Sequence, residues 1–332
     1  MLMPKIAVRC NPSHLRGMGN IFRQLYLGKI PRERGMDVVF YLPEYPPACA
    51  LLKKEGFTSH PSQANVGLPP NASDHFDLII LDILDTTKEG IQSLRPRCKR
   101  IVSFEDLGPG RNHVDLLIDC NLEPEQAEHI ADRVKVLFGL PYSTLSPDFS
   151  LYHDRKRHFP PILENCLISL GGTDPNNLTL KLAKLLLHKK RKLKITVLAG
   201  PGFSDSENIA RLQSEQLTVL SNISNMAETL FAHQAIVCSG GVTLHEALAV
   251  GTPAFVVNQV PHQEDKARFL QSKGAAINLG LGNNFDVQKL LESLDMGMEE
   301  REELSRAGKA LIDGQGIHRV ADELIHMAKK GS

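Results

Sequence analysis

The chain has 332 residues and equal numbers of acidic and basic side chains, 38 of each, so its formal net charge is zero. This length exceeds what one hydrophobic core usually supports, and we therefore expect two domains. The balanced charge argues against a nucleic-acid-binding surface, which requires clustered basic residues. The six cysteines show neither CxxC nor zinc-like spacing and are expected to be free thiols in a reducing cytoplasm.

No apolar stretch approaches the roughly 18 residues that a membrane-spanning helix needs, and the first residues lack the apolar segment of a signal peptide. These features predict a cytoplasmic protein without stable membrane insertion. The one strongly basic run, residues 188–194, is typical of the solvated C-terminal end of a helix. Contact with anionic lipid is the alternative for this run.

Short apolar runs alternate with helical patterns, beginning with a strand at residues 5–9 and a helix at about residues 21–34. The other strands expected in the first half are at residues 37–41, 77–82, 100–104 and 115–118. Those expected in the second half are at residues 167–170, 194–198, 217–220, 235–237 and 254–257. Strands separated by helices predict βαβ units, and therefore an α/β protein with parallel sheets.

This alternation breaks between residues 145 and 164, where three prolines surround a charged patch. Such a composition is typical of a domain linker. We expect a first Rossmann-like domain at residues 1–150 and a second at residues 151–316. A last helix, within residues 317–332, could pack back on the first domain.

Two glycine turns in the second half each follow an apolar run and lead into a helical pattern. They comprise Gly171, Gly172 and Thr173 in the first turn and Ser239, Gly240 and Gly241 in the second. A glycine turn between a strand and a helix lets backbone amides face an anion, and the helix N-terminus adds partial positive charge. Two such turns in one domain predict a diphosphate site, and thus a nucleotide joined to another group.

Side chains near these turns suit a bound nucleotide. The hydroxyls of Ser239 and Thr243 could bind phosphate oxygens, and Glu246 lies where its carboxylate could accept hydrogen bonds from a ribose. The alternative for Glu246 is a first-turn carboxylate that interacts with the helix dipole. Asn177 or Asn176 is a candidate N-cap for the helix after the first turn.

Polar residues and glycines also follow two other strands. The loop after the first strand contains Gly17, Gly19 and Asn20, but it has neither a Walker A motif nor the full GxGxxG spacing. This loop is equally well explained as a structural turn. After residues 254–257, Gln263 is a candidate sugar contact at the carboxyl end of the sheet.

Together these segments resemble the nucleotide-sugar hydrolases of pseudaminic acid biosynthesis and the related SpsG-type surface-polysaccharide proteins, which are relatives of the MurG glycosyltransferase. The resemblance extends from Arg9 to about Gly280 and is carried by residues 9–23, 101–118, 138–145, 171–179 and 239–248. Each block alone is common, whereas the set is specific. The resemblance implies a GT-B fold, with two Rossmann-like parallel-sheet domains and an interdomain cleft.

The resemblance also implies that the second domain holds the nucleotide and the first holds the sugar. Glu246 would hold the ribose, the backbone between Ile223 and Met226 would meet the base, with uracil expected, and both turns would hold the diphosphate. The candidate sugar contacts are Asn11, Gly17, Gly19, Glu105, Asp106 and Gln263.

Three positions of the first domain depart from the family's pattern. The family's general-base histidine corresponds to Asn20, its aspartate to Asn11, and an aromatic residue to Leu84. An amide has no proton that titrates near neutral pH, so Asn20 cannot act as a general base. His14 in the same loop is an alternative base, and Asp82 is a further candidate catalytic residue. We expect that binding is kept while the chemistry is changed or absent.

Three functions follow from these observations. The favoured one is a hydrolase or glycosyltransferase of bacterial surface-polysaccharide or nonulosonic acid biosynthesis that releases UDP from a UDP-sugar. The alternatives are a non-catalytic UDP-sugar-binding protein and a UDP-sugar epimerase on the same fold. No motif requires a metal or an organic cofactor, so backbone amides are expected to hold the diphosphate. The expected partner is the UDP-sugar, without nucleic acid, and no oligomeric state is predicted.

Overall fold

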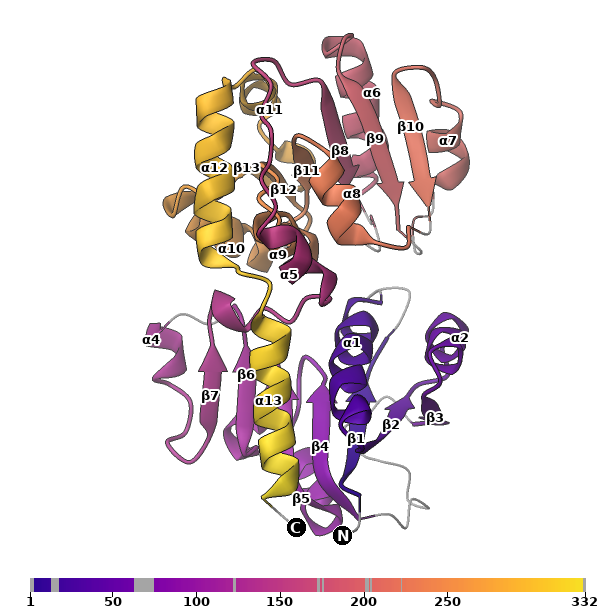
Figure 1. The fold of residues 1–332 in the computed structure, drawn as a ribbon, viewed down its shortest axis with the longest axis vertical. Coiled ribbons are helices and arrows are strands. Elements are labelled where there is room, and N and C mark those ends of the chain that lie inside the picture. The colour runs from indigo at the N-terminus through magenta and orange to yellow at the C-terminus, as the bar shows by residue number, and fades with distance from the viewer. Residues whose placement is uncertain are drawn as a thin grey trace. The chain divides into compact units, whose positions relative to one another are not determined.

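The computed structural model describes residues 3–12, 18–62, 75–121, 124–171, 174, 176–200, 203, 205–221 and 223–330. Contacts within the chain divide it into two compact units (Figure 1). Unit 1 comprises residues 1–146 and 315–332, and unit 2 comprises residues 147–314. The sequence boundaries were expected at residues 150 and 316.

Unit 1 is built on a sheet of seven parallel strands in the order β3-β2-β1-β4-β5-β6-β7. The strands are β1 (Lys5–Cys10), β2 (Asp37–Leu42), β3 (Thr58–Pro61), β4 (Phe76–Asp82), β5 (Cys98–Phe104), β6 (Leu116–Asp119) and β7 (Lys135–Phe138). The strand order reverses between β1 and β4, and ligands of open α/β sheets bind at the carboxyl ends of the strands beside such a point.

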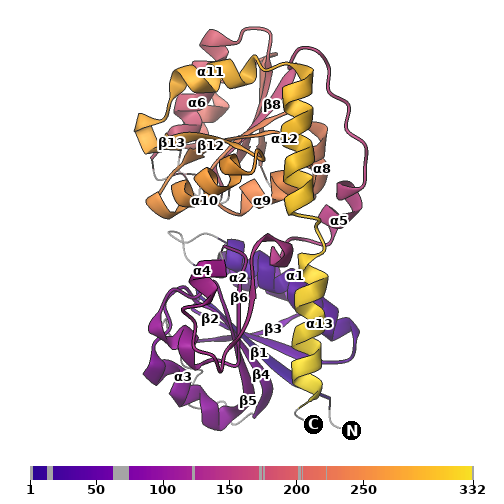
Figure 2. The same cartoon turned by 90° about the vertical axis from the view of Figure 1, so that its left-hand side faces the viewer.

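Helices cover both faces of the unit-1 sheet (Figure 2). Neighbouring residues of a strand point to opposite faces, so Ile6 and Val8 of β1 join one core and Ala7 joins the other. The C-terminal helix α13 contributes Ile317 and Val320 to the first core, beside α1. The helices are α1 (Gly19–Glu33), α2 (Pro46–Lys54), α3 (Lys88–Leu94), α4 (Pro124–Ala127) and α13 (Gly316–Lys329), with 3-10 turns at η1 (Arg95–Arg97), η2 (Pro109–His113) and η3 (Leu140–Tyr142).

Unit 2 contains six parallel strands in the order β10-β9-β8-β11-β12-β13, with a reversal between β8 and β11. The strands are β8 (Asn165–Ser169), β9 (Lys194–Ala199), β10 (Leu217–Ser221), β11 (Ile236–Cys238), β12 (Ala254–Asn258) and β13 (Ile277–Leu281). The predicted α/β class with two parallel sheets is confirmed.

The helices of unit 2 follow its strands in alternation. They are α5 (Asp148–His153), α6 (Leu178–Lys189), α7 (Ser206–Ala210), α8 (Met226–Ala232), α9 (Val242–Ala249), α10 (Pro261–Ser272), α11 (Val287–Leu294) and α12 (Met298–Leu311), with a 3-10 turn at η4 (Gly282–Asn284). Across the described ranges, neither unit has a helix that is both long enough and apolar enough to cross a membrane.

Two arginines tie the segment between α5 and β8 to the rest of unit 2. Arg157 donates to the carbonyl oxygens of Phe231, at 3.1 Å, and His233, at the C-terminal end of α8. Arg301 of α12 donates to the carbonyl oxygens of Pro160 and, at 3.3 Å, Pro161. Because carbonyls at a helix end and in irregular backbone lack partners of their own, these arginines hold the proline-rich segment in place.

Candidate functional site

Three loops of unit 2 meet at the carboxyl ends of β8, β11 and β12. Ser239 donates its hydroxyl to the carbonyl oxygen of Leu170 at 3.1 Å. A Cβ atom added to Gly171 would lie 3.9 Å from Ser239 Oγ, and one added to Gly241 would lie 3.6 Å from Ser239 Oγ and 3.9 Å from Gln263 Nε2. The structure therefore brings Gly171, Ser239, Gly241 and Gln263 together. The remaining residues of the first predicted turn, Gly172 and Thr173, lie outside the described residues.

Gly240 allows the second turn to lie against the start of α10. A Cβ atom at this position would lie 2.6 Å from Asn258 Oδ1 and 2.6 Å from the carbonyl oxygen of Gln263. Asn258 is fully buried, and its amide donates to Asn278 Oδ1 at 2.8 Å and to the Gly280 carbonyl at 3.0 Å. Close packing of the turn is therefore the physical reason for glycine at position 240.

The variant Gly240→Ala is expected to lower the free energy of unfolding by about 1–3 kcal/mol, because the turn or α10 must shift. Gly241→Ala is the matched control, since its Cβ atom would meet Ser239 Oγ only at 3.6 Å and its φ angle is −85°. We expect a change of less than about 0.5 kcal/mol for the control. Chemical denaturation of both variants measures the free energy of unfolding. Equal decreases in the two variants would contradict the packing role of Gly240.

The N-termini of the two helices after the glycine turns differ in their capping. The buried carboxylate of Asp174 accepts hydrogen bonds from the amides of Leu178, at 3.0 Å, and Thr179, at 2.7 Å, and so caps α6. The expectation that Asn177 or Asn176 caps this helix is wrong, because Asn177 has a left-handed backbone and makes no side-chain cap hydrogen bond. Asn176 instead donates to the carbonyl of Gln259 at 3.3 Å.

Helix α9 begins after Gly241 without a side-chain cap from any described residue. Its first turn contains no acidic residue either. Uncapped first-turn amides and the positive end of the helix dipole favour a bound anion. Of the two predicted phosphate-binding helix ends, α9 is therefore the one whose amides are available, whereas Asp174 already occupies those of α6.

Glu246 lies half-buried on α9, one turn beyond the uncapped amides. Burial raises the pKa of Glu246 to about 7, and a hydrogen bond from the Thr243 side chain partly opposes that rise. The Thr243 hydroxyl therefore donates a hydrogen bond to the Glu246 carboxylate, and the Ser239 hydroxyl donates to the Leu170 carbonyl oxygen. Backbone amides, more than these two hydroxyls, remain available as donors to phosphate.

Of the predicted base-binding residues, Ile223 lies in the connection between β10 and α8, and Met226 is the first residue of α8. Ile223 and Met226 are both half-buried. Between them, Asn225 accepts a hydrogen bond from the amide of Glu228 at 2.9 Å and so caps α8. This connection is at the same carboxyl edge of the sheet as the glycine turns, but β10 is the outermost strand on its side.

At the carboxyl edge of unit 1, Arg23 of α1 joins two predicted site residues. Its guanidinium donates to Asp82 through Nε at 3.0 Å and Nη2 at 2.8 Å, and it pairs with Glu105 through Nη1 at 2.7 Å. Gln24 also donates to Asp82 at 2.9 Å. Burial lowers the pKa of Arg23, but the two carboxylates outweigh burial and raise it. Asp82 and Glu105 thus share a permanently charged partner.

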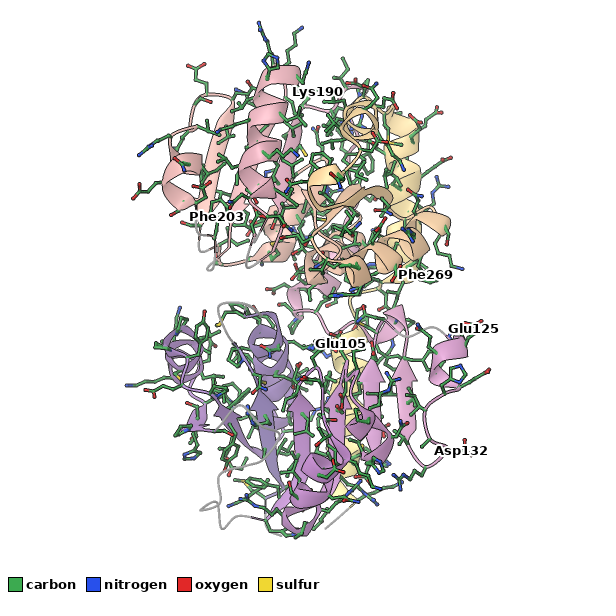
Figure 3. All side chains as sticks on the ribbon, turned by 180° about the vertical axis from the view of Figure 1, so that it is seen from behind. Glu105, Glu125, Asp132, Lys190, Phe203 and Phe269 are labelled. Carbon is green, nitrogen blue, oxygen red and sulfur yellow. The ribbon has the colours of Figure 1, made fainter. Side chains whose placement is uncertain are left out.

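Glu105 and Asp106 follow β5 and lie in different surroundings. Glu105 is labelled in Figure 3. It has a φ angle of 45°, a left-handed conformation that is unusual for a non-glycine residue, and its side chain is 27% exposed. Asp106 is fully buried and accepts hydrogen bonds from the side chains of Thr86 and Ser103 and from the amides of Thr86 and Gly108. In this structure Asp106 holds its loop together, and Glu105 is the carboxylate that reaches solvent.

Two residues beside Glu105 were missed by sequence reasoning. Asp119 ends β6, and its burial, together with Glu105, raises its pKa to about 6. Cys120 donates its thiol to Glu105 at 3.2 Å. The signal that could have identified Asp119 is its position directly after the apolar run 116–118, as Asp82 follows the apolar run 78–81.

The remaining first-domain candidates lie around the start of α1. Asn20 is half-buried in the first turn of α1, and its Oδ1 atom is buried without a hydrogen-bond partner among the described residues. Gly19 is exposed, and no atom would lie within 4 Å of a Cβ atom there. Asn11 is half-buried just after β1. His14 and Gly17 lie outside the described residues.

Comparison with known proteins agrees with this architecture. Residues 169–324 match the glycosyltransferase family 28 C-terminal domain. MurG of Acinetobacter baumannii has a similar structure, with a TM-score of 0.66 and 16% identity over 97% of this chain and 99% of that one. At this level of identity the likeness establishes the fold, and the predicted GT-B fold is confirmed.

Curated relatives cover different shares of the chain. The Bacillus subtilis spore coat polysaccharide biosynthesis protein SpsG is 24% identical over 95% of this chain and 96% of its own. An uncharacterized protein of Methanocaldococcus jannaschii is 28% identical over 77% of this chain, which spans 56% of that protein. The UDP-2,4-diacetamido-2,4,6-trideoxy-beta-L-altropyranose hydrolase of Campylobacter jejuni is 24% identical over 60% of this chain and 73% of its own. Residues 169–324 are thus similar to a glycosyltransferase family 28 C-terminal domain, and the GT-B-fold chain is similar in sequence to SpsG and to a UDP-sugar hydrolase.

Proposed function

We propose that this protein processes a UDP-sugar of bacterial surface-polysaccharide biosynthesis, as a hydrolase or a glycosyltransferase that releases UDP. The observation that carries the proposal is the uncapped N-terminus of α9, followed one turn later by the half-buried carboxylate of Glu246. An anion-binding helix end and a carboxylate that can accept from ribose hydroxyls suit a nucleoside diphosphate. The relatives named SpsG and UDP-sugar hydrolase support the same class of ligand.

In this proposal the unit-2 residues bind the nucleotide and the leaving diphosphate. Glu246 accepts from the ribose, residues 223–226 contact the base, and the amides at Gly241 hold the phosphates, without a metal. As the bond to the sugar breaks, the helix end stabilises the charge that develops on UDP. Gln263 is oriented for this site, because its Oε1 accepts from the Gln259 amide at 2.9 Å while its Nε2 faces Gly241.

The unit-1 residues are proposed to bind the sugar and to move the proton. Glu105 is the partly exposed carboxylate of this edge, and burial together with Glu105 raises the pKa of Asp119 beside it to about 6. A carboxyl group that titrates near neutral pH can both give and take a proton. These two residues would take over the acid–base role for which Asn20 is chemically unsuited.

Calorimetric titration with UDP tests the nucleotide site. Wild type is expected to bind, and Glu246→Ala to bind about tenfold more weakly, because the ribose hydroxyls lose a charged acceptor. Glu228→Ala is the matched control, since Glu228 is an exposed carboxylate in the first turn of α8. Absence of UDP binding by wild type would refute the proposal. Equal losses of UDP affinity in the two variants would show that Glu246 makes no specific contact with the ribose and interacts only with the helix dipole.

A non-catalytic UDP-sugar-binding protein is the second candidate, and the Asn20 amide favours it. If only the base has been lost, Asn20→His should raise UDP release from a panel of UDP-amino-sugars well above the wild-type rate. Asn20→Gln is the control, because it changes the side chain without adding a titratable group. Efficient release by wild type would exclude a pure binding function, and no gain in Asn20→His would contradict the lost-base explanation.

A further inference from the structure

A cation-rich groove lies at the amino edge of the unit-1 sheet, opposite the edge that holds Asp82 and Asp119. It consists of two adjoining cavities of about 300 and 370 Å³, which share Asp115 and Arg133 in their walls. The amino ends of β5, β6 and β7 and the C-terminal end of α13 lie at this end of unit 1 (Figure 1). Five cationic side chains line the groove: Arg95, Arg100, Arg133, Lys135 and Lys330.

The groove has fewer carboxylates than cations, and each carboxylate already forms an ion pair with at least one of these cations. Asp115 pairs with Arg95 at 2.5 Å and with Arg100 at 3.4 Å. Glu323 pairs with Lys135 at 2.7 Å. Five cations against two lining carboxylates leave a surplus of three positive charges, in a chain whose net charge is zero. The surplus is therefore local to this groove.

Two of the guanidinium groups donate to neutral acceptors, and Arg95 does so in addition to its pair with Asp115. Arg133 donates to the Asn112 carbonyl through Nε at 3.1 Å and Nη2 at 2.8 Å, and Arg95 donates to the His113 carbonyl at 2.7 Å. Arg133 Nη2 also lies 2.5 Å from His113 Nδ1, and burial together with the Arg133 charge lowers the pKa of His113. The neutral imidazole accepts from Arg133, and no carboxylate in the described ranges pairs with Arg133.

We propose that this groove binds the phosphate group of a phosphorylated small molecule or of an anionic lipid headgroup. A planar guanidinium recognises phosphate through two parallel hydrogen bonds, and held guanidinium groups lose little entropy on binding. The cavity volumes suit a small phosphorylated ligand. Because the groove lies at the amino edge of the sheet, a ligand there is distinct from the sugar at the carboxyl edge.

Titration with inorganic phosphate, followed by ³¹P NMR line broadening, tests the phosphate chemistry. The double variant Arg100→Gln/Arg133→Gln is expected to weaken phosphate binding about tenfold or more, and added salt should weaken wild-type binding. Arg211→Gln is the matched control, since it removes an exposed arginine of unit 2. All titrations are repeated with saturating UDP, because phosphate is also expected to occupy the nucleotide site.

Glu323→Gln separates charge from folding, because it removes a negative charge from the same groove. We expect this variant to bind phosphate several-fold more tightly than wild type, which a misfolded groove cannot do. The proposal is overturned if wild type does not bind phosphate with UDP present, or if both groove variants bind like wild type.

Co-sedimentation with vesicles distinguishes the two sources of phosphate. Binding to phosphatidylglycerol vesicles but not to phosphatidylcholine vesicles, lost in Arg100→Gln/Arg133→Gln, assigns the groove to a lipid surface. Phosphate binding without vesicle binding assigns it to a soluble phosphomonoester. Either result is independent of the proposed nucleotide site, whose own test is the Glu246→Ala titration.

Discussion

The variant Glu246→Gln is expected to weaken UDP binding by about tenfold and to make the protein more stable above pH 7. Burial raises the pKa of Glu246 from 4.5 to about 7 in the folded protein. The folded state therefore holds this proton more tightly than the unfolded state. Stability is lost as pH rises from about 4.5 to about 7, and the full cost remains at higher pH.

A neutral glutamine avoids that cost, so Glu246→Gln should gain stability over wild type as pH rises through this window. A shift of this size limits the gain to roughly 3 kcal/mol, and about 2 kcal/mol is expected for a half-buried side chain. Urea denaturation of both proteins at pH 5 and pH 8 measures the difference. If Glu246→Gln is less stable than wild type at pH 8, the Glu246 carboxylate stabilises the folded protein. That result would contradict the argument that its buried charge is kept for binding the ribose.

The pH dependence of UDP binding gives a second measurement on the same pair of proteins. A protonated carboxyl group accepts hydrogen bonds less well than a carboxylate, so wild-type affinity should rise between pH 6 and pH 8 by more than that of Glu246→Gln. Phosphate groups also titrate near pH 6. The difference between the two proteins removes this common contribution.

The variant Arg23→Gln is expected to destabilise unit 1 by about 3 kcal/mol or more, because removing one partner leaves a buried charge uncompensated. The Asp82 side chain is 6% exposed, and among the described residues the amide of Gln24 would remain as its neutral donor. Glu105 would lose the same cation. Turnover is therefore expected to fall together with stability.

The control for this prediction is Arg34→Gln. Arg34 pairs with Asp322 at 2.8 Å, the same distance as the Arg23–Asp82 pair, but the two side chains are 48% and 63% exposed. We expect a loss below about 1 kcal/mol for this solvent-exposed pair. In addition, Asp82→Asn should partly rescue Arg23→Gln, because it removes the uncompensated charge. Equal losses in Arg23→Gln and Arg34→Gln would contradict the burial argument.

The local sequence was sufficient to predict ten of the thirteen strands that the structure describes, whereas β3, β7 and β13 were not expected. The run 77–82 corresponds to β4, whose residues are nearly all buried, as expected for a parallel strand covered on both faces. The helix expected at about residue 21 begins at Gly19, where no capping side chain marks the boundary. The turn after β11 was recognisable because Ser239, Gly240 and Gly241 stand directly between a strand and a helix.

What the sequence could not provide were the partners of the polar side chains. Asp174 caps α6 in place of the neighbouring asparagines because the backbone carries its carboxylate to two amides four and five residues later. Asp106 was predicted to contact the sugar. In the structure it is buried and accepts a hydrogen bond from the amide of Thr86, twenty residues earlier in the chain. A short polar side chain can bind its own loop or a ligand, and only the path of the backbone decides between them.

By itself, the sequence determined two α/β halves with parallel strands and turns suited to phosphate, because apolar periodicity and glycine placement act over a few residues. Only the tertiary structure decided that Asp174 caps α6, whereas α9 has no side-chain cap among the described residues. It likewise decided that Arg23 pairs with both Asp82 and Glu105, which lie 59 and 82 residues further along the chain. The tertiary structure also decided that side chains from residues 95–135 and 323–330 line one cation-rich groove. The physical reason is that strand order and helix packing bring distant charges together, and burial then sets their pairing and their pKa values.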